Sequence, residues 1–249
     1  MLVNITHNKQ KYIADLSNPL DISIPIHPDG INAWGIENLE INPVKSGEWI
    51  GDVKMGSPVN FNNIFFNPHA HTTHTECVGH ISSEKESLNK ELLTFFFISQ
   101  LISIAPKKDN NDFIITKNLI KKMINKKDNI DALIIRTIPN TKNKINKNYS
   151  NTNPPYFSEK AVKYLVEIGI QHLLIDLPSI DKEKDGGSLI AHKLFWQFPK
   201  NIRHGCTITE FIYASNQIKD GKYLLNLQFV PFDNDASPSR PVLFKLEEK

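Results

Sequence analysis

Short apolar segments that alternate with helical segments constrain the fold of this chain most strongly. Residues 95–104, 130–136 and 171–177 are apolar runs of strand length. Between them, residues 117–124 have helical spacing, and residues 158–169 form a helical segment with an N-cap serine at its start and a glycine at its end. Strands that alternate with helices are typical of a sheet packed against helices, so we expect an α/β fold.

The rest of the chain adds strands around this centre. Residues 20–26 alternate like a strand, and residues 87–94 are helix-like. Further strands are predicted at 206–213, 223–231 and 241–245. Residues 137–155 are rich in Asn, Lys and Pro, which predicts a long loop. Because the pattern is the same on both sides of that loop, we expect a single domain over residues 1–249.

The charge balance argues against nucleic-acid binding. The net charge is +2, with 29 basic and 27 acidic residues. Lysines gather in residues 106–111 and 117–127, but they mix with Asn and Ile as they do throughout the chain. A nucleic-acid interface needs a focused basic stripe. We therefore expect solvated lysines and no nucleic-acid partner.

Hydrophobic residues make up 40% of the 249 residues, which is enough for a globular core. No run of 18 or more apolar residues occurs, so we expect no membrane association. The first residues lack an apolar core of signal-peptide length, and the two cysteines suit a reducing compartment. These features predict a cytoplasmic location.

Four of the nine histidines fall within twelve residues, at His69, His71, His74 and His80, and Glu76 lies among them. Imidazole and carboxylate are the usual ligands of Zn²⁺ and similar divalent ions. The stretch follows the aromatic run 60–66 and Pro68, so we place it at a strand end and in the loop beyond. The density predicts a metal site, and a chance surface cluster is the alternative.

The spacing of these residues excludes two common metal motifs. His74 and Glu76 are two residues apart and share a face if the segment is extended. The pattern is not the His-Glu-x-x-His helix of a metalloprotease, and the paired cysteines of a zinc finger are missing. Cys77 is either a soft ligand or a small buried residue beside the site, and the second interpretation is favoured.

Four blocks in order resemble one family. The segment Thr73-His74-Thr75-Glu76 precedes His80, and it is followed by Ile-Asp-Leu-Pro-Ser-Ile-Asp at 175–181, Ala-His-Lys-Leu-Phe-Trp at 191–196 and Thr-Ile-Thr-Glu at 207–210. Together they resemble the cyclase family, which includes bacterial kynurenine formamidase and isatin hydrolase. Its signature is His-x-Gly-Thr-His-x-Asp-x-Pro-x-His. The resemblance implies an α/β single domain with a barrel-like mixed β-sheet and flanking helices.

The resemblance also implies a site. His69, His74 and Glu76 would bind a divalent metal, Zn²⁺ or Mn²⁺, with Glu210 completing the set and His192 directed toward a second ion. His80 would transfer protons as the general acid and base. Trp34 would lie against the substrate, and the chain would form a homo-oligomer.

This sequence departs from the signature at several positions. Glu76 replaces the aspartate, Thr72 the glycine and Val78 the proline. The first histidine should stand at Ala70, so either His69 or His71 must take its role. As strand residues two apart, they would point the same way at different depths, and we favour His69. One metal or two, and the choice of ion, stay open.

The implied function is a metal-dependent hydrolase of a small cyclic or N-formyl amide, of the arylformamidase kind. A metal-activated water and a histidine proton shuttle are sufficient for that reaction, without a nucleophilic serine. Ser179, Asp176 and Asp181 are interpreted as structural or as supports of the ligands. The alternative is a metal- or ligand-binding relative that has lost catalysis.

Overall fold

The chain folds around a closed β-barrel in the computed structural model, which describes residues 1–124 and 126–249. Seven strands follow one another around the barrel in the order β17–β16–β9–β12–β14–β15–β8, and β8 pairs with β17 to close it. These are β8 (His74–Glu76), β9 (Phe96–Ile104), β12 (Ala132–Thr137), β14 (His172–Ile175), β15 (Thr207–Glu210), β16 (Gly221–Phe229) and β17 (Ala236–Glu248). The predicted α/β fold with a barrel-like mixed sheet is confirmed.

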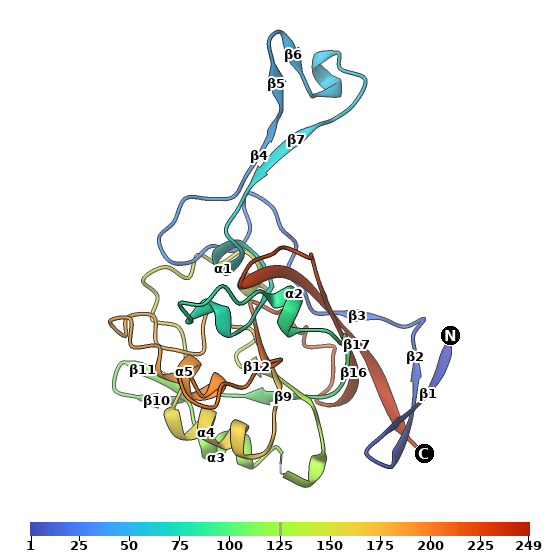
Figure 1. Ribbon diagram of the computed structural model, residues 1–249, viewed down its shortest axis with the longest axis vertical. Coiled ribbons are helices and arrows are strands. Elements are labelled where there is room, and N and C mark those ends of the chain that lie inside the picture. The colour runs from blue at the N-terminus through green and yellow to red at the C-terminus, as the bar shows by residue number, and fades with distance from the viewer. Residues whose placement is uncertain (125) are drawn as a thin grey trace.

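Helices connect the parallel half of the barrel. Strands β9, β12, β14 and β15 run parallel, whereas the other pairings within the barrel are antiparallel. A parallel neighbour needs a crossover connection, and the three crossovers contain α3 (Lys117–Lys121), α4 (Glu159–Glu167) and α5 (Ile190–Trp196). These helices lie together along one side of the barrel (Figure 1).

Alternation along β12 explains why its sequence is apolar throughout. Leu133 and Ile135 belong to the core layer shared with α4 and α5, which also holds Leu165 and Phe195. Ile134 belongs to the other layer, together with residues of β14, β16 and β17. A strand that is covered on both faces reads as a continuous hydrophobic run. The strand therefore anchors the barrel against both layers.

Several strands differ in length from the sequence expectation: the predicted strand 206–213, for example, is β15 (Thr207–Glu210), and two others differ more in their pairing. The predicted strand 20–26 shortens to β3 (Leu20–Asp21). Beyond it, the Ile24 N–H donates to the Thr73 hydroxyl at 2.8 Å instead of to a neighbouring strand. The last strand is much longer than the predicted 241–245, because β17 pairs in turn with β8, β16, β3 and β2.

The remaining elements lie around the barrel. The amino-terminal hairpin pairs with the end of β17. The predicted helix 87–94 is the single turn α2, and the loop 137–155 contains one short 3-10 turn. The elements not given elsewhere are β1 (Leu2–His7), β2 (Gln10–Asp15), α2 (Leu88–Glu91), β10 (Lys107–Asp109), β11 (Asp112–Ile115), β13 (Tyr156–Phe157) and 3-10 turns at Val53–Met55, Val78–His80, Lys126–Asp128 and Lys142–Ile145.

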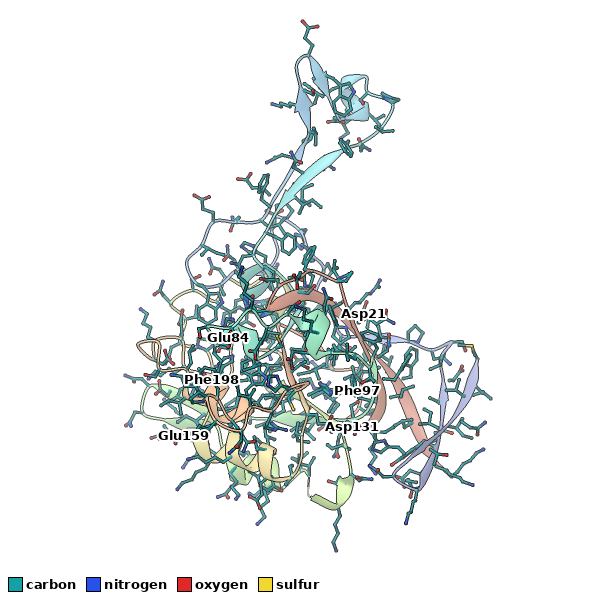
Figure 2. The ribbon with its side chains drawn as sticks, in the orientation of Figure 1. Asp21, Glu84, Phe97, Asp131, Glu159 and Phe198 are labelled. Carbon is teal, nitrogen blue, oxygen red and sulfur yellow. The ribbon has the colours of Figure 1, made fainter. Side chains whose placement is uncertain are left out.

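A two-stranded arm projects away from the barrel (Figure 1). It consists of β4 (Glu40–Pro43) and β7 (Asn62–Phe65), with the small hairpin of β5 (Lys45–Ser46) and β6 (Trp49–Ile50) at its far end. Figure 2 shows its side chains extending into open space around the ribbon. Several are large and apolar, namely Trp49, Val53, Met55, Val59, Phe61, Ile64 and Phe65. The aromatic run of 60–66 is thus a strand, as predicted, but one on an exposed arm.

Over residues 1–124 and 126–249, none of the helices has the length and apolar character needed to span a membrane.

Candidate metal centre

Two of the predicted ligands lie on β8, where the barrel closes. His74 and Glu76 are two residues apart on this strand, so both side chains project from one face. Both are completely buried. Strand β15 runs antiparallel beside β8 and places Glu210 directly opposite His74. Strand pairing therefore brings a histidine and two carboxylates from distant parts of the sequence to one place.

His69 joins them from the one-turn helix α1 (Pro68–His71). The Asn67 side chain caps this turn by accepting a hydrogen bond from the His69 N–H at 2.9 Å, and Pro68 occupies its first position. The stretch does follow a strand, β7, but the expectation that His69 and His71 are strand residues pointing the same way was wrong. Because each helical residue is rotated by about 100° from the last, rings two residues apart point in different directions.

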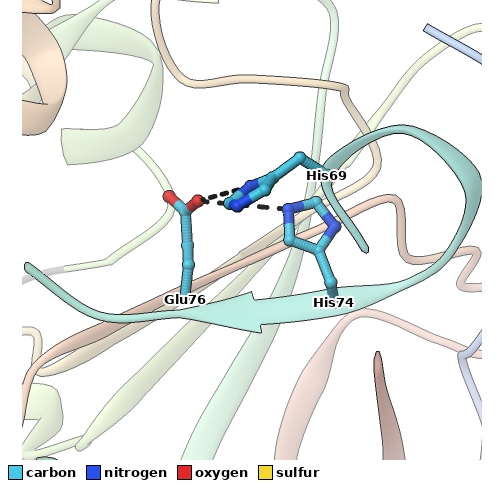
Figure 3. Close-up of side chains that lie close together, drawn as sticks. All are labelled: His69, His74 and Glu76. Carbon is cyan, nitrogen blue, oxygen red and sulfur yellow. Dashed lines mark ion pairs between the residues drawn. The ribbon is translucent and has the colours of Figure 1, made fainter. Parts of the chain in front are cut away.

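Figure 3 shows His69, His74 and Glu76 converging. The Glu76 Oε2 atom lies 3.3 Å from His69 Nδ1 and 4.0 Å from His74 Nε2. On the other side, His74 Nε2 is 3.5 Å from Glu210 Oε2. Ligand atoms of His69, His74 and Glu76 all lie within 4.8 Å of one another, which is the spacing of a set that can hold one ion.

Two further predicted residues contact the same carboxylates. His192, on α5, places Nε2 at 3.1 Å from Glu76 Oε1 and 3.9 Å from Glu210 Oε1. His80, in the short turn after β8, places Nδ1 at 3.8 Å from Glu76 Oε2. His192 is buried, whereas His80 is partly exposed. The structure therefore gathers His69, His74, Glu76, His80, His192 and Glu210 around one centre.

The centre leaves several ligand atoms without partners. Among the described residues, His74 Nε2, Glu76 Oε2 and Glu210 Oε1 are buried and accept or donate no hydrogen bond. The other nitrogen of His74, Nδ1, lies 3.0 Å from the Thr72 carbonyl and donates to it, so Nε2 carries the lone pair. Unpaired buried acceptors are costly. A divalent cation held by these atoms would satisfy them, so the residues present fit a metal.

Burial and the neighbouring carboxylates shift the pKa values of His69, His74 and His192 in opposite directions. Burial alone would lower the pKa of His69 and His192. The carboxylates that face each ring, Asp235 and Glu76 at His69 and Asp181 and Glu76 at His192, favour the protonated ring and raise each pKa to about 10. Burial lowers the pKa of His74 to about 3.

The two glutamates shift in opposite directions. Burial would raise the pKa of Glu76, but the surrounding histidines hold it well below its usual range. Burial and repulsion from Glu76 raise the pKa of Glu210 well above it. Neighbouring acids whose pKa values are shifted in opposite directions are typical of functional centres.

His71 takes a different position from His69. Its Nδ1 accepts a hydrogen bond from the Asn67 N–H at 3.0 Å, and the ring lines a pocket at the base of the arm with Glu37 and Phe65. In the described parts of the chain, His71 joins no group of side chains spaced to hold an ion. The geometry therefore favours His69 over His71 as a ligand.

Trp34 and Cys77 lie beside the centre rather than in it. The Trp34 indole N–H donates to the His69 carbonyl at 2.9 Å, so the ring contacts the turn that carries His69. Its place against a substrate remains a prediction. Cys77 is buried, its Sγ lies 3.7 Å from the Glu86 carbonyl, and burial raises the pKa of its thiol to about 12. A neutral thiol in that position behaves as a packed side chain.

Sequence reasoning missed one residue at the centre, Asp235. Its Oδ2 atom lies 3.0 Å from His69 Nε2 and 3.2 Å from His80 Nδ1. Nothing in the segment Asp-Asn-Asp-Ala at 233–236 distinguishes it from an ordinary loop acid. Only the pairing of β17 with β8, which sets Ala236 opposite Glu76, brings Asp235 to the histidines.

The supporting role expected for Asp181 agrees with its contacts. Its Oδ2 atom lies 2.6 Å from His192 Nδ1, and Oδ1 accepts from the Ala191 N–H at 2.7 Å. Asp176 instead binds Thr137 and forms a buried ion pair with Lys144 at 2.7 Å. Asp181 therefore orients a histidine of the centre, whereas the contacts of Asp176 stabilise the loop after β12.

Comparison with known proteins identifies the family. The family described as "Putative cyclase" matches residues 15–182. The chain belongs to this cyclase family. The matched range contains the histidine-rich stretch, whereas His192 and Glu210 lie beyond it. A comparison with curated proteins finds no match.

Solved structures of cyclase-like proteins share the fold. An isatin hydrolase bound to the product analogue thioisatinate superposes with a TM-score of 0.68 at 17% identity, over 93% of each chain. A potential metal-dependent hydrolase with cyclase activity gives 0.64 at 19%, over 92% of this chain and 98% of that one. A predicted metal-dependent hydrolase from Bacillus stearothermophilus gives 0.60 at 18%, over 91% and 98%.

Proposed function

We propose that this protein is a metal-dependent hydrolase that cleaves the C–N bond of a small cyclic or N-formyl amide, as an arylformamidase does. The observation that carries the proposal is the buried centre, in which His74, Glu76 and Glu210 present unpaired ligand atoms at the closure of a cyclase-family barrel. Relatives of the same fold that are described as metal-dependent hydrolases and as isatin hydrolase support it.

The ligand set suits Zn²⁺ or Mn²⁺. Nitrogen and carboxylate oxygen are the donors, and the one nearby cysteine is held away as a neutral thiol. His69, His74 and Glu76 would hold one ion with Glu210. His192, which contacts both glutamates, would join a second. A bound divalent cation supplies Lewis acidity and lowers the pKa of a coordinated water to about 7.

His80 would move the proton in this reaction. It is the most exposed histidine of the centre, at 29% against 21% for His69, so an entering substrate could reach it. It would accept a proton from the attacking water as the new C–O bond forms. It would then deliver that proton to the nitrogen as the C–N bond breaks. No serine nucleophile is needed.

We further propose that the chain acts as a homo-oligomer. The arm exposes a series of large apolar side chains from Trp49 to Phe65, which is unusual for a surface that faces only water. A second copy of this chain would bury them. Sedimentation should give a mass that is a multiple of 28.4 kDa, whereas a strict monomer at micromolar concentration would contradict this.

A turnover assay beside metal analysis tests the function. The purified protein, loaded with Zn²⁺ or Mn²⁺, should hydrolyse members of a panel of N-formyl anilides, lactams and lactones. A protein that is fully loaded with metal and converts no member of the panel would favour the alternative, a metal-binding relative without catalysis. The departures from the family signature at Ala70, Glu76 and Val78 are the observations behind that alternative.

A further inference from the structure

Asp235 occupies a fixed position beside the centre. It immediately precedes β17, and its carbonyl accepts a hydrogen bond from the Cys77 N–H at 3.0 Å. The next residue, Ala236, pairs with Glu76 on β8. The backbone of Asp235 is therefore held by the same strand that carries two of the proposed ligands, and its side chain is about three-quarters buried, with 24% exposed.

One carboxylate oxygen of Asp235 bridges two imidazole rings. Oδ2 lies 3.0 Å from His69 Nε2 and 3.2 Å from His80 Nδ1. The two rings are stacked at a tilt of 31°, with centroids 4.3 Å apart. A carboxylate accepts hydrogen bonds from both rings without moving either. Asp235 thus links a proposed ligand to the proposed proton carrier.

The bond to His69 determines which nitrogen faces the metal. A metal ligand must be a neutral imidazole, and in the neutral ring a hydrogen bond from Nε2–H to Asp235 would leave the lone pair on Nδ1, the atom 3.3 Å from Glu76 Oε2. The centre repeats this arrangement. His74 donates through Nδ1 to the Thr72 carbonyl, and His192 through Nδ1 to Asp181. In each case the acceptor behind the ring would leave the other nitrogen, which faces the carboxylates, to bind an ion when one is present.

The bond to His80 has a different consequence. With Nδ1–H held by Asp235, Nε2 is the nitrogen that remains to exchange a proton with substrate. An acceptor behind a catalytic imidazole fixes its tautomer and orientation. The same residue therefore bears on metal affinity through His69 and on proton transfer through His80.

We propose that Asp235 is a positioning residue that orients His69 for metal binding and His80 for proton transfer through a single carboxylate oxygen. The role of Asp235 toward His80 rests on the proposed hydrolase function. Its role toward His69 does not, because metal binding can be measured without turnover. Removal of Asp235 should weaken metal binding and, separately, slow the reaction of the metal-saturated enzyme.

Asp235→Ala tests the proposal, with Asp233→Asn as the matched control. Asp233 lies two residues away, is exposed, and carries the same charge. Calorimetric titration with Zn²⁺ should show a loss of affinity of roughly 10–100-fold for Asp235→Ala and little change for Asp233→Asn. Asp235→Asn keeps an oxygen acceptor in nearly the same volume, so it should fold and recover part of the affinity.

The role of Asp235 toward His80 is tested by a double-mutant cycle with His80→Ala, measured at saturating metal. If Asp235 acts on the rate through His80, Asp235→Ala should reduce kcat roughly 10-fold or more in the wild-type background and hardly at all in the His80→Ala background. KM should change much less than kcat.

Three results would overturn the proposal. If Asp235→Ala leaves the metal affinity unchanged, Asp235 does not orient His69. If Asp233→Asn loses as much affinity as Asp235→Ala, the effect comes from the net charge of the loop and not from the contact with His69. Loss of a whole metal equivalent at saturation would make Asp235 a ligand instead. Absence of turnover in the wild type would refute the hydrolase function, and the titration would still decide the role of Asp235 toward His69.

Discussion

The sharpest test of the centre replaces His74 with alanine and compares it with Cys77→Ala. Both side chains are fully buried, and they stand three residues apart. Only His74 presents an unpaired nitrogen, Nε2, to Glu76 and Glu210. Both changes leave a small cavity, but only one removes a proposed ligand. The metal-dependent part of the stability should therefore separate the two variants.

The expected magnitude follows from linkage. At a metal concentration 100 times the dissociation constant, binding stabilises the folded state by about 2.7 kcal/mol. In a chain of this length, 1 kcal/mol shifts Tm by roughly 2–4 °C, so metal should raise the wild-type Tm by roughly 5–11 °C. If loss of His74 weakens binding at least 100-fold, the shift at the same concentration should nearly vanish. Cys77→Ala should keep it.

The assay is thermal unfolding with Zn²⁺ or Mn²⁺ and with chelator, beside metal analysis of each sample. The cavity and the lost hydrogen bond from His74 Nδ1 to the Thr72 carbonyl lower the stability equally with metal and with chelator, so their contributions cancel in the difference between the two Tm values. A full metal-dependent shift in His74→Ala would refute the ligand assignment. Loss of the shift in Cys77→Ala would place sulfur in the ligand set.

Four further outcomes are expected. His69→Ala should lose metal affinity and His71→Ala should keep it in a Zn²⁺ titration, and the reverse order would reassign the ligand. His80→Ala should lower kcat roughly 10²–10⁴-fold with unchanged metal content, because proton transfer contributes that much; a proportional loss of metal would contradict it. Burial lowers the pKa of His172 to about 3, below the value of about 6.5 in the unfolded chain, so folded His172 binds no proton between these values. Stability should consequently fall as pH drops from about 6.5 toward 3, by at most about 1.4 kcal/mol per pH unit, and His172→Gln should flatten this slope in denaturant melts; an unchanged slope would show that His172 does not contribute. Phe61→Ser on the arm should lower the sedimenting mass, whereas an unchanged oligomer would place the contact elsewhere.

Local pattern was enough to predict β9, β12 and β14 and the helices α3 and α4 of the parallel half, whereas the helix that carries His192 was expected only from the family resemblance. The apolar run of β12 and the capped helix α4 follow from local pattern, because their residues are buried in a periodic way or satisfy the backbone at a helix end. The ligand types in residues 69–80 were equally readable, since imidazole and carboxylate differ chemically from their surroundings. The position of His69 on a helical turn was not, because a single turn is too short to show a period.

The contacts that assemble the centre depend on strand pairing between distant parts of the chain. Glu210 stands opposite His74 through the register of β15 on β8, and Asp235 arrives because β17 closes the barrel against the same strand. Asp235 and His80 are separated by 155 positions, and no local pattern marks the pair. Their meeting depends on strand pairing over the whole chain. The physical reason is that backbone hydrogen bonds around a closed barrel fix the register of every strand, and that register sets which side chains converge.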